Sequence, residues 1–384
     1  MRIFTFLVLI LTISACDDDE IQPNNIPAPD IYAFERAGES TVDFSGQTER
    51  LNQVAELKSK LLAEADKGNA VTAEALLNAY ENTDGNGGGL YSFASTKQLK
   101  DKTFAPDRDA RLFEKLFDDL AAASEEANSG VFASNGQAGL ITREGSGKTI
   151  LVDARGREFT QLIEKGLMGA VFYHQIFNVY LTEDRIGDAV ENEAVLEGKS
   201  YTEMEHHWDE AFGYWHPPLD FTSSWPESRM EETRFWSRYS NVVDNIHNGL
   251  LGTNKIIMVA FINGRTAIVN KDYETRDAQK EILYENLDLV AAATCVHYIN
   301  STLKHINQGH TGESFHTLSE AWAFVNALRY NPMRRLSLTE IESIMESDFG
   351  ENGNFWNVTV NGLNSAKNKI ISAYPALIQV ADVL

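Results

Sequence analysis

The sequence predicts an all-α protein, organised as one large helical body or as two joined ones. Apolar residues recur at helical spacing in most segments, and residues 277–308 repeat them every seven positions, which is typical of bundle packing. No succession of alternating apolar and polar positions indicates a β-sheet. At 384 residues, the chain also exceeds the usual size of a single hydrophobic core.

The first 15 residues have the pattern of a short secretion signal. Arg2 precedes an apolar run from Ile3 to Leu11, which is too short to span a bilayer permanently. The following Ile13-Ser-Ala-Cys16 is similar to a bacterial lipobox, in which Cys16 is lipidated and becomes the first residue of the mature chain. Residues 16–30 contain prolines among acids and asparagines, and we expect them to form a tether.

The residues after Cys16 bear on where the protein is displayed. The acidic run Asp17-Asp-Asp-Glu20 resembles the surface-export signal of some Gram-negative lipoproteins. It favours an outer-membrane lipoprotein exposed at the cell surface, with periplasmic display and a merely solvated acidic start as the alternatives. If Cys16 is acylated, Cys295 is the one remaining thiol, and its apolar helical surroundings predict a buried structural residue.

The globular part begins near Tyr32 and consists of segments with helical patterning. The predicted helices are residues 47–67, 72–80, 107–128, 153–181, 201–215, 227–251, 255–270, 277–308, 315–330, 338–347 and 363–383. Two polar, glycine-containing segments, residues 84–89 and 129–149, are predicted to be loops.

The predicted helix 153–181 is expected to be central, because from Gly166 onward it is apolar on nearly every side. Gly166 and Gly169 favour the close approach of a neighbouring helix. His174 is a polar exception, and its position fits a hydrogen-bonded core histidine better than a metal ligand.

The net charge of −23 excludes nucleic acid as a partner, because the chain offers no basic surface to neutralise a run of phosphates. An acidic surface suits solubility, cations or a basic partner.

The strongest functional signal is Glu203-Met-Glu-His-His-Trp-Asp-Glu210, within the predicted helix 201–215. On a helix, Glu203, His207 and Glu210 share one face and form a candidate stripe of metal ligands. Imidazole and carboxylates suit zinc, iron or manganese. Sets of candidate ligands that use His206 are alternatives. On spacing alone, a solvated acidic helix with histidines at its edges is an equally good interpretation.

A second candidate group lies in the stretch from Glu313 to Glu320. His316 and Glu320 are four residues apart, with Ser319 between them. Glu313-x-x-His316 paired with Glu203-x-x-His206 would also match the arrangement of di-iron helical bundles. Glu313, however, fits a helix cap better than a ligand position.

Four tryptophans fall close together in the sequence, and they are Trp208, Trp215, Trp225 and Trp236. A sugar or haem platform is one interpretation. Core packing at a helix junction is the favoured one.

The stretch His207-Trp-Asp-Glu210, with the aromatic and glycine residues up to Trp215, resembles the His-x-x-Glu motif of imelysin-like proteins. The resemblance extends to residues 164–170 and 316–322. The opening residues, Tyr32-x-Phe34, Asp43-Phe-Ser-Gly-Gln47 and Arg50-Leu51, are similar to a Gram-negative lipoprotein family of unknown function. One departure is Glu205, where the imelysin pattern has a glycine that permits close backbone approach.

This resemblance implies two fused helical bundles, residues 31–220 and 221–384, with a cleft between them. The expected metal ligands are His207, Glu210, Glu203, His316 and Glu320. The expected cleft-lining residues are Ser319, His174 and Arg265.

The expected function is capture of a metal ion or an iron complex, with iron or zinc as the ion and an uptake system as the partner. An imelysin-type metallopeptidase is the first alternative, although the chain lacks the His-Glu-x-x-His pair of hydrolytic zinc sites. A glycan-binding surface lipoprotein that uses the tryptophans is the second.

Overall fold

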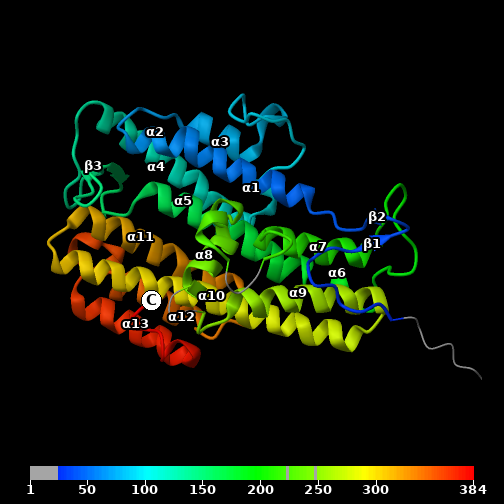
Figure 1. Ribbon diagram of the computed structural model, residues 1–384. Helices are drawn as coiled ribbons and strands as arrows, with labels where there is room; N and C mark the ends of the chain where they lie inside the picture. Colours follow the sequence, from blue (N-terminus) through cyan, green and yellow to red (C-terminus); the bar gives the residue numbers. More distant parts are fainter. Residues whose placement is uncertain (1–24, 222–224, 246–248) are drawn as a thin grey trace, which may run out of the picture.

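The computed structural model describes residues 25–221, 225–245 and 249–384, and this part of the chain is all-α, as predicted. Most helices run along the long axis of an elongated molecule (Figure 1). Cys16 and the signal segment lie outside the described residues. Within the described ranges, no helix combines the length and the apolarity needed to cross a bilayer.

The N-terminal helices form one layer of the molecule, which is the upper layer in Figure 1. Helix α1 (Ser45–Leu57) continues through a π-helical turn, Lys58–Leu62, into α2 (Ala63–Asp66), so that residues 45–66 are one continuous helix. Next come α3 (Ala73–Glu81), which Thr72 caps through a hydrogen bond from the Ala75 N–H, and α4 (Arg111–Asn128).

The central helix starts at α5 (Phe159–Leu167) and continues through the π-helical segments Met168–Tyr173 and Ile176–Tyr180. Every residue from Phe159 to Tyr173 is buried, which confirms the predicted central position. A Cβ on Gly169 would lie 3.2 Å from the Cα of Ala327, so a neighbouring helix does approach closely here. The helix begins later than predicted because Asp153 accepts the backbone N–H groups of Arg155 and Arg157 and forms a turn instead.

The remaining helices are listed here with their bounds: α6 (Glu183–Ile186), α7 (Glu203–Trp215), α8 (Phe235–Asn245), α9 (Thr253–Asn270), α10 (Tyr273–Asn307), α11 (Thr311–Ala327), α12 (Leu338–Ser343) and α13 (Val360–Ala373). Helix α10 packs lengthwise against both α9 and α11. The heptad pattern of residues 277–308 therefore predicted a bundle helix correctly.

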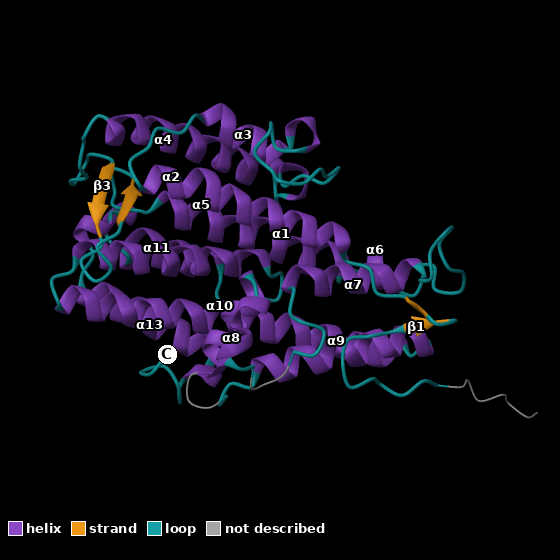
Figure 2. Cartoon of the chain, turned by 45° about the horizontal axis from the view of Figure 1, so that its top comes forward, coloured by secondary structure: helices purple, strands orange, loops and turns teal. Residues whose placement is uncertain are grey.

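Three further segments differ from the sequence prediction. The predicted helix 363–383 is shorter, because α13 ends at Ala373, just before Pro375. Residues 227–251 do not form one helix, because a 3-10 helix, Glu227–Glu232, precedes α8. Residues 129–149 are not only a loop, since β3 (Gly139–Thr142) pairs antiparallel with β4 (Thr149–Val152). Strands of four residues are too short to give a clear alternating pattern. This hairpin and the smaller one of β1 (Glu35–Arg36) and β2 (Glu39–Ser40) lie at opposite ends of the molecule (Figures 1 and 2).

Residues from both sides of position 220 contribute to a single buried core. Tyr173 stacks on Trp236 with ring centroids 3.6 Å apart, and Trp208 packs edge-on against Phe261. All four clustered tryptophans are buried, which favours the packing interpretation over a sugar platform. The division into residues 31–220 and 221–384 stays a prediction.

Candidate functional site

Helix α7 is held in place from its first turn. The Thr202 hydroxyl accepts the Glu205 N–H while the Glu205 carboxylate accepts the Thr202 N–H, which forms a capping box. The helix ends at His216, whose φ of 55° is left-handed, directly before Pro217 and Pro218. These local signals fix which residues α7 contains.

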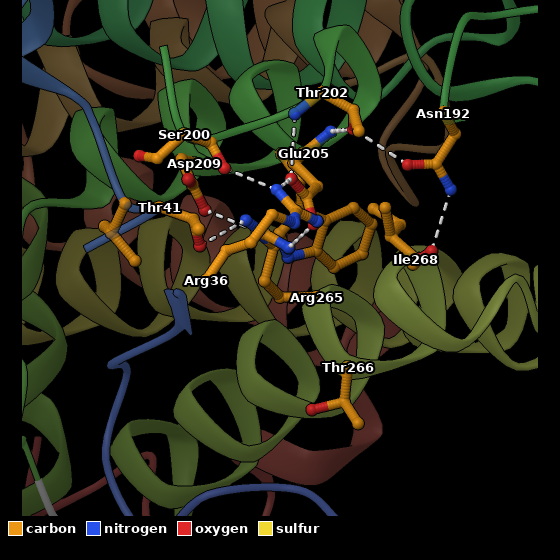
Figure 3. Close-up of polar contacts among 12 residues, drawn as sticks. Arg36, Thr41, Asn192, Ser200, Thr202, Glu205, Asp209, Arg265, Thr266 and Ile268 are labelled. Atoms are coloured by element: carbon orange, nitrogen blue, oxygen red, sulfur yellow. Dashed lines mark hydrogen bonds and ion pairs between the residues drawn. The ribbon is translucent and has the colours of Figure 1, made fainter. Parts of the chain in front are cut away.

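The inner side of α7 carries a buried ionic network (Figure 3). The Arg265 guanidinium, on α9, lies 3.0 Å from a carboxylate oxygen of Glu205 and 3.0 Å from one of Asp209. All three side chains are almost completely buried. Arg36 makes a bidentate contact with Glu205 at 2.8 and 2.9 Å, from a more exposed position.

Arg265 does not line an open cleft, contrary to the expectation from sequence. Its side chain is fully buried, and Thr41 accepts a further hydrogen bond from it at 3.1 Å. Burial disfavours the charged form of Glu205, but Arg36 and Arg265 outweigh this effect and lower the pKa of Glu205. The Glu205 carboxylate therefore anchors α7 to α9 and to the N-terminal segment.

The other side of α7 presents His207 and Glu210. The Nδ1 of His207 lies 2.8 Å from the Arg185 carbonyl oxygen, and its Nε2 lies 3.3 Å from the Arg185 guanidinium. Burial lowers the pKa of His207, which keeps the ring neutral at pH 7. One oxygen of Glu210 accepts a hydrogen bond of 2.9 Å from the Gln47 side chain on α1.

The predicted pair therefore does not face open solvent, because α1, α6 and the end of the central helix lie opposite it. His207 is buried and its ring lies 6.3 Å from that of Tyr180. Glu203 is half-buried on the same side of α7, close enough for its charge to act on His207. His206 stacks on Tyr201 instead.

Basic residues near Glu210 were missed in the sequence. Arg50, Lys102 and Arg185 come from α1, from the segment after α3 and from α6. The charges of Arg50, Glu210 and Arg185 all act on Lys102. No spacing rule relates three residues in separate segments, so only the tertiary structure reveals them.

The second predicted group lies at the start of the central helix. His316 Nδ1 is 2.6 Å from a carboxylate oxygen of Glu158, which is itself buried. Burial disfavours the charged form of His316, but Glu158 outweighs this effect and raises the pKa of His316. Ser319 accepts the Glu158 N–H at 2.8 Å, and Glu320 lies 3.9 Å from the Lys165 ammonium.

The two predicted groups do not meet. His316 contacts Glu158, just before the central helix, whereas His207 contacts Tyr180 at its far end. A helix of that length spans roughly 30 Å. Among the residues that the structure describes, no three His, Cys, Asp or Glu side chains are arranged to hold a metal ion. The same separation excludes the di-iron arrangement in which Glu313-x-x-His316 would pair with Glu203-x-x-His206. Glu313 instead lies in the first turn of α11 and forms an ion pair with Arg143.

His174 lies on the central helix, between the two groups. It is half-buried, its ring centroid is 4.9 Å from that of Phe104, and its Nδ1 has no partner among the described residues. Burial and then the charge of Lys102 lower the pKa of His174 to about 4. His174 is therefore neutral at pH 7 and neighbours the basic residues around Glu210.

A family model described as a domain of unknown function (DUF4856) matches residues 29–376. The chain has no significant match among curated proteins or among solved structures.

Proposed function

The chain belongs to this family of unknown function, and we propose that it is a membrane-anchored lipoprotein that binds an iron complex or a metal ion at His207 and Glu210. Its role would be that of an accessory to metal uptake. The lipobox at Cys16 and the resemblance to imelysin-like proteins support the anchor and the uptake role.

The orientation of the His207 ring carries the proposal. Because its Nδ1–H donates to the Arg185 carbonyl, Nε2 carries the lone pair that a metal could bind, which is the usual preparation of a metal-binding histidine. The Glu210 carboxylate is one helical turn away on the same side, and it retains an oxygen beyond the one that Gln47 contacts. Arg185 Nη1 competes for Nε2 at 3.3 Å, but its side chain is exposed and free to move aside.

The small number of protein ligands favours an iron complex over a bare ion. His207 and Glu210 supply two ligands, and Glu203 is not placed to add a third, whereas zinc takes about four ligands and iron about six. A chelated ion brings the remaining ligands with it. The group around His316 is too far away to complete the coordination.

Neither alternative gains a specific observation. Trp225, which a glycan platform would require to be exposed, is buried and donates to the Arg229 carbonyl oxygen. For a metallopeptidase, His206 Nε2 lies 3.9 Å from Glu210, but the described residues include no group of three His, Cys, Asp or Glu side chains placed to hold zinc.

The test is calorimetric titration of the full-length chain in detergent with ferric citrate and, separately, with zinc chloride. The His207→Ala and Glu210→Gln variants should each lose about tenfold or more in affinity, because each removes one of two protein ligands. His297→Ala is the matched control, since this half-buried histidine lies on α10 and not on α7. Equal affinities for His207→Ala and His297→Ala would contradict the proposal.

A further inference from the structure

A polar groove with a volume of about 790 Å³ runs along α13. Helix α13 contacts α10 and lies on the opposite side of the molecule from the N-terminal layer (Figures 1 and 2). Most of the lining residues belong to α13, and the others are Arg335, in the loop before α12, and Glu340, on α12. No lining residue comes from α7, so the groove is separate from His207 and Glu210.

One side of α13 carries a row of neutral polar side chains that line the groove. We refer to them as the amide row, and they are Asn361, Asn364, Ser365, Asn368 and Ser372. Their spacing of three and four residues places them on one side of the helix, opposite the buried Leu363, Ala366 and Ile370. From the first member to the last, the helix rises about 16 Å. The groove therefore offers amide and hydroxyl groups along an extended line.

The amide row is free to bind a ligand. Within the described part of the chain, none of its five side chains forms a hydrogen bond with another protein group. Other helical residues of the same types behave differently, since Asn286 donates to the Ile282 carbonyl at 2.8 Å and Ser319 donates to the Phe315 carbonyl at 2.6 Å. The amide row thus keeps its whole capacity to donate and accept hydrogen bonds.

The composition of α13 does not serve the stability of the helix. Asparagine and serine are poorer helix formers than alanine, lysine or glutamate, because their side chains compete with the backbone for hydrogen bonds. Helix α13 also contains no acidic residue, although the chain has 56 of them. The exposed side of α4, by contrast, carries Asp118, Asp119, Glu125 and Glu126. A merely solvated side of α13 would resemble that of α4, so the amide row indicates a binding role.

The charged residues of the groove already have partners. Lys369 Nζ lies 2.6 Å from a carboxylate oxygen of Asp348, and Arg335 forms an ion pair with Glu285. The Glu340 carboxylate caps the first turn of α12. The hydrogen-bonding capacity that remains in the groove is therefore neutral, which favours an uncharged ligand over an anion or a cation.

The lining does not match the recurring ways in which proteins bind peptides. Those use a free sheet edge, an apolar groove for a helix, an aromatic groove for a proline-rich segment, or an unpaired arginine cluster. The residues that line this groove provide none of these four features. An oligosaccharide does match, because each sugar hydroxyl both donates and accepts, as a carboxamide side chain does.

We infer that the groove along α13 binds a neutral oligosaccharide, whose hydroxyl groups contact Asn364 and Asn368 in the middle of the amide row. This site differs from a tryptophan platform, since the four clustered tryptophans are buried. It is also independent of the metal site, because the two share no residue.

The experiment is calorimetric titration of the full-length chain with maltohexaose, cellohexaose, xylohexaose and mannohexaose, in a detergent whose head group is not a sugar. The Asn364→Ala and Asn368→Ala variants should each bind the preferred oligosaccharide about twofold to tenfold more weakly, since each loses a neutral hydrogen bond. Asn128→Ala is the matched control and should bind as the unchanged protein does. Asn128 is also an exposed helical asparagine, but it lies at the end of α4 and outside the groove.

Thermal melts of the same variants give a second readout. Alanine is the better helix former, so Asn364→Ala and Asn368→Ala should be at least as stable as the unchanged protein while they bind more weakly. Lower stability would instead assign the asparagines to the fold and overturn the inference. No binding of the four neutral oligosaccharides, or equal affinities for Asn364→Ala and Asn128→Ala, would also overturn it. Binding of hexagalacturonate alone would replace the neutral ligand by an anionic one and refute the inference as stated.

Discussion

Replacing Arg265 by methionine should lower the free energy of unfolding by about 3–5 kcal/mol, because this change breaks a buried ion pair and leaves the partner charges uncompensated. Arg265 is fully buried and lies 3.0 Å from both Glu205 and Asp209. Asp209 loses the one cation that contacts it among the described residues, whereas Glu205 keeps Arg36, so we expect the lower part of that range. Methionine has a comparable shape, which limits the contribution of a cavity.

Urea denaturation followed by circular dichroism measures the effect, and Arg36→Met is the control. Arg36 contacts the same Glu205 carboxylate, but its side chain is 39% exposed. Pairs with an exposed partner contribute about 0.2–1 kcal/mol. A loss for Arg265→Met no larger than that for Arg36→Met would refute the reasoning.

The pH dependence gives a second check on the same variant. Burial raises the pKa of Asp209 to about 6 even with Arg265 beside it, and removal of Arg265 should raise the pKa further. A carboxyl group with a raised pKa in the folded state holds its proton more tightly there than in the unfolded chain. The variant should therefore lose stability as the pH rises through that pKa, and its deficit should be smallest in acid.

Two further predictions concern other parts of the molecule. Glu158→Gln should return the raised pKa of His316 toward or below its ordinary value, as measured by NMR titration. In the unchanged protein, protonation of His316 stabilises the fold at low pH, and this contribution is lost as the pH rises through the pKa of His316. The variant should lack this pH-dependent contribution. Gly264→Ala should cost about 1–3 kcal/mol in urea denaturation, because its Cβ would lie 2.1 Å from the Trp208 ring. Gly46→Ala, where the nearest atom belongs to the flexible Lys97 side chain, should be neutral or stabilising.

The helices were predictable because their signals are local. The capping residues Thr72 and Ser337 each accept a backbone N–H three residues on, and the prolines after His216 end α7 where expected. The four-residue strands β3 and β4 were missed because so short an alternation does not stand out from a loop.

The candidate site was predicted only in part. The face shared by His207 and Glu210 follows from the helical period, and the structure places both in partly buried surroundings opposite α1. The grouping of His207 with His316 did not follow, because the length of the central helix separates them. Arg265 was expected to line the cleft that the resemblance implies, and only its distance from Asp209 shows that it is an internal counter-ion.

The sequence by itself determined that this chain is helical, where most of its helices begin and end, and which side chains of α7 lie on one side. The tertiary structure alone decided that Glu205 and Asp209 point to Arg265, and that Gln47 of α1 contacts Glu210. The physical reason is the range of the interactions. Helix propensity, capping and amphipathic period act within a few residues, whereas charge pairing and burial depend on segments that the chain brings together from far apart.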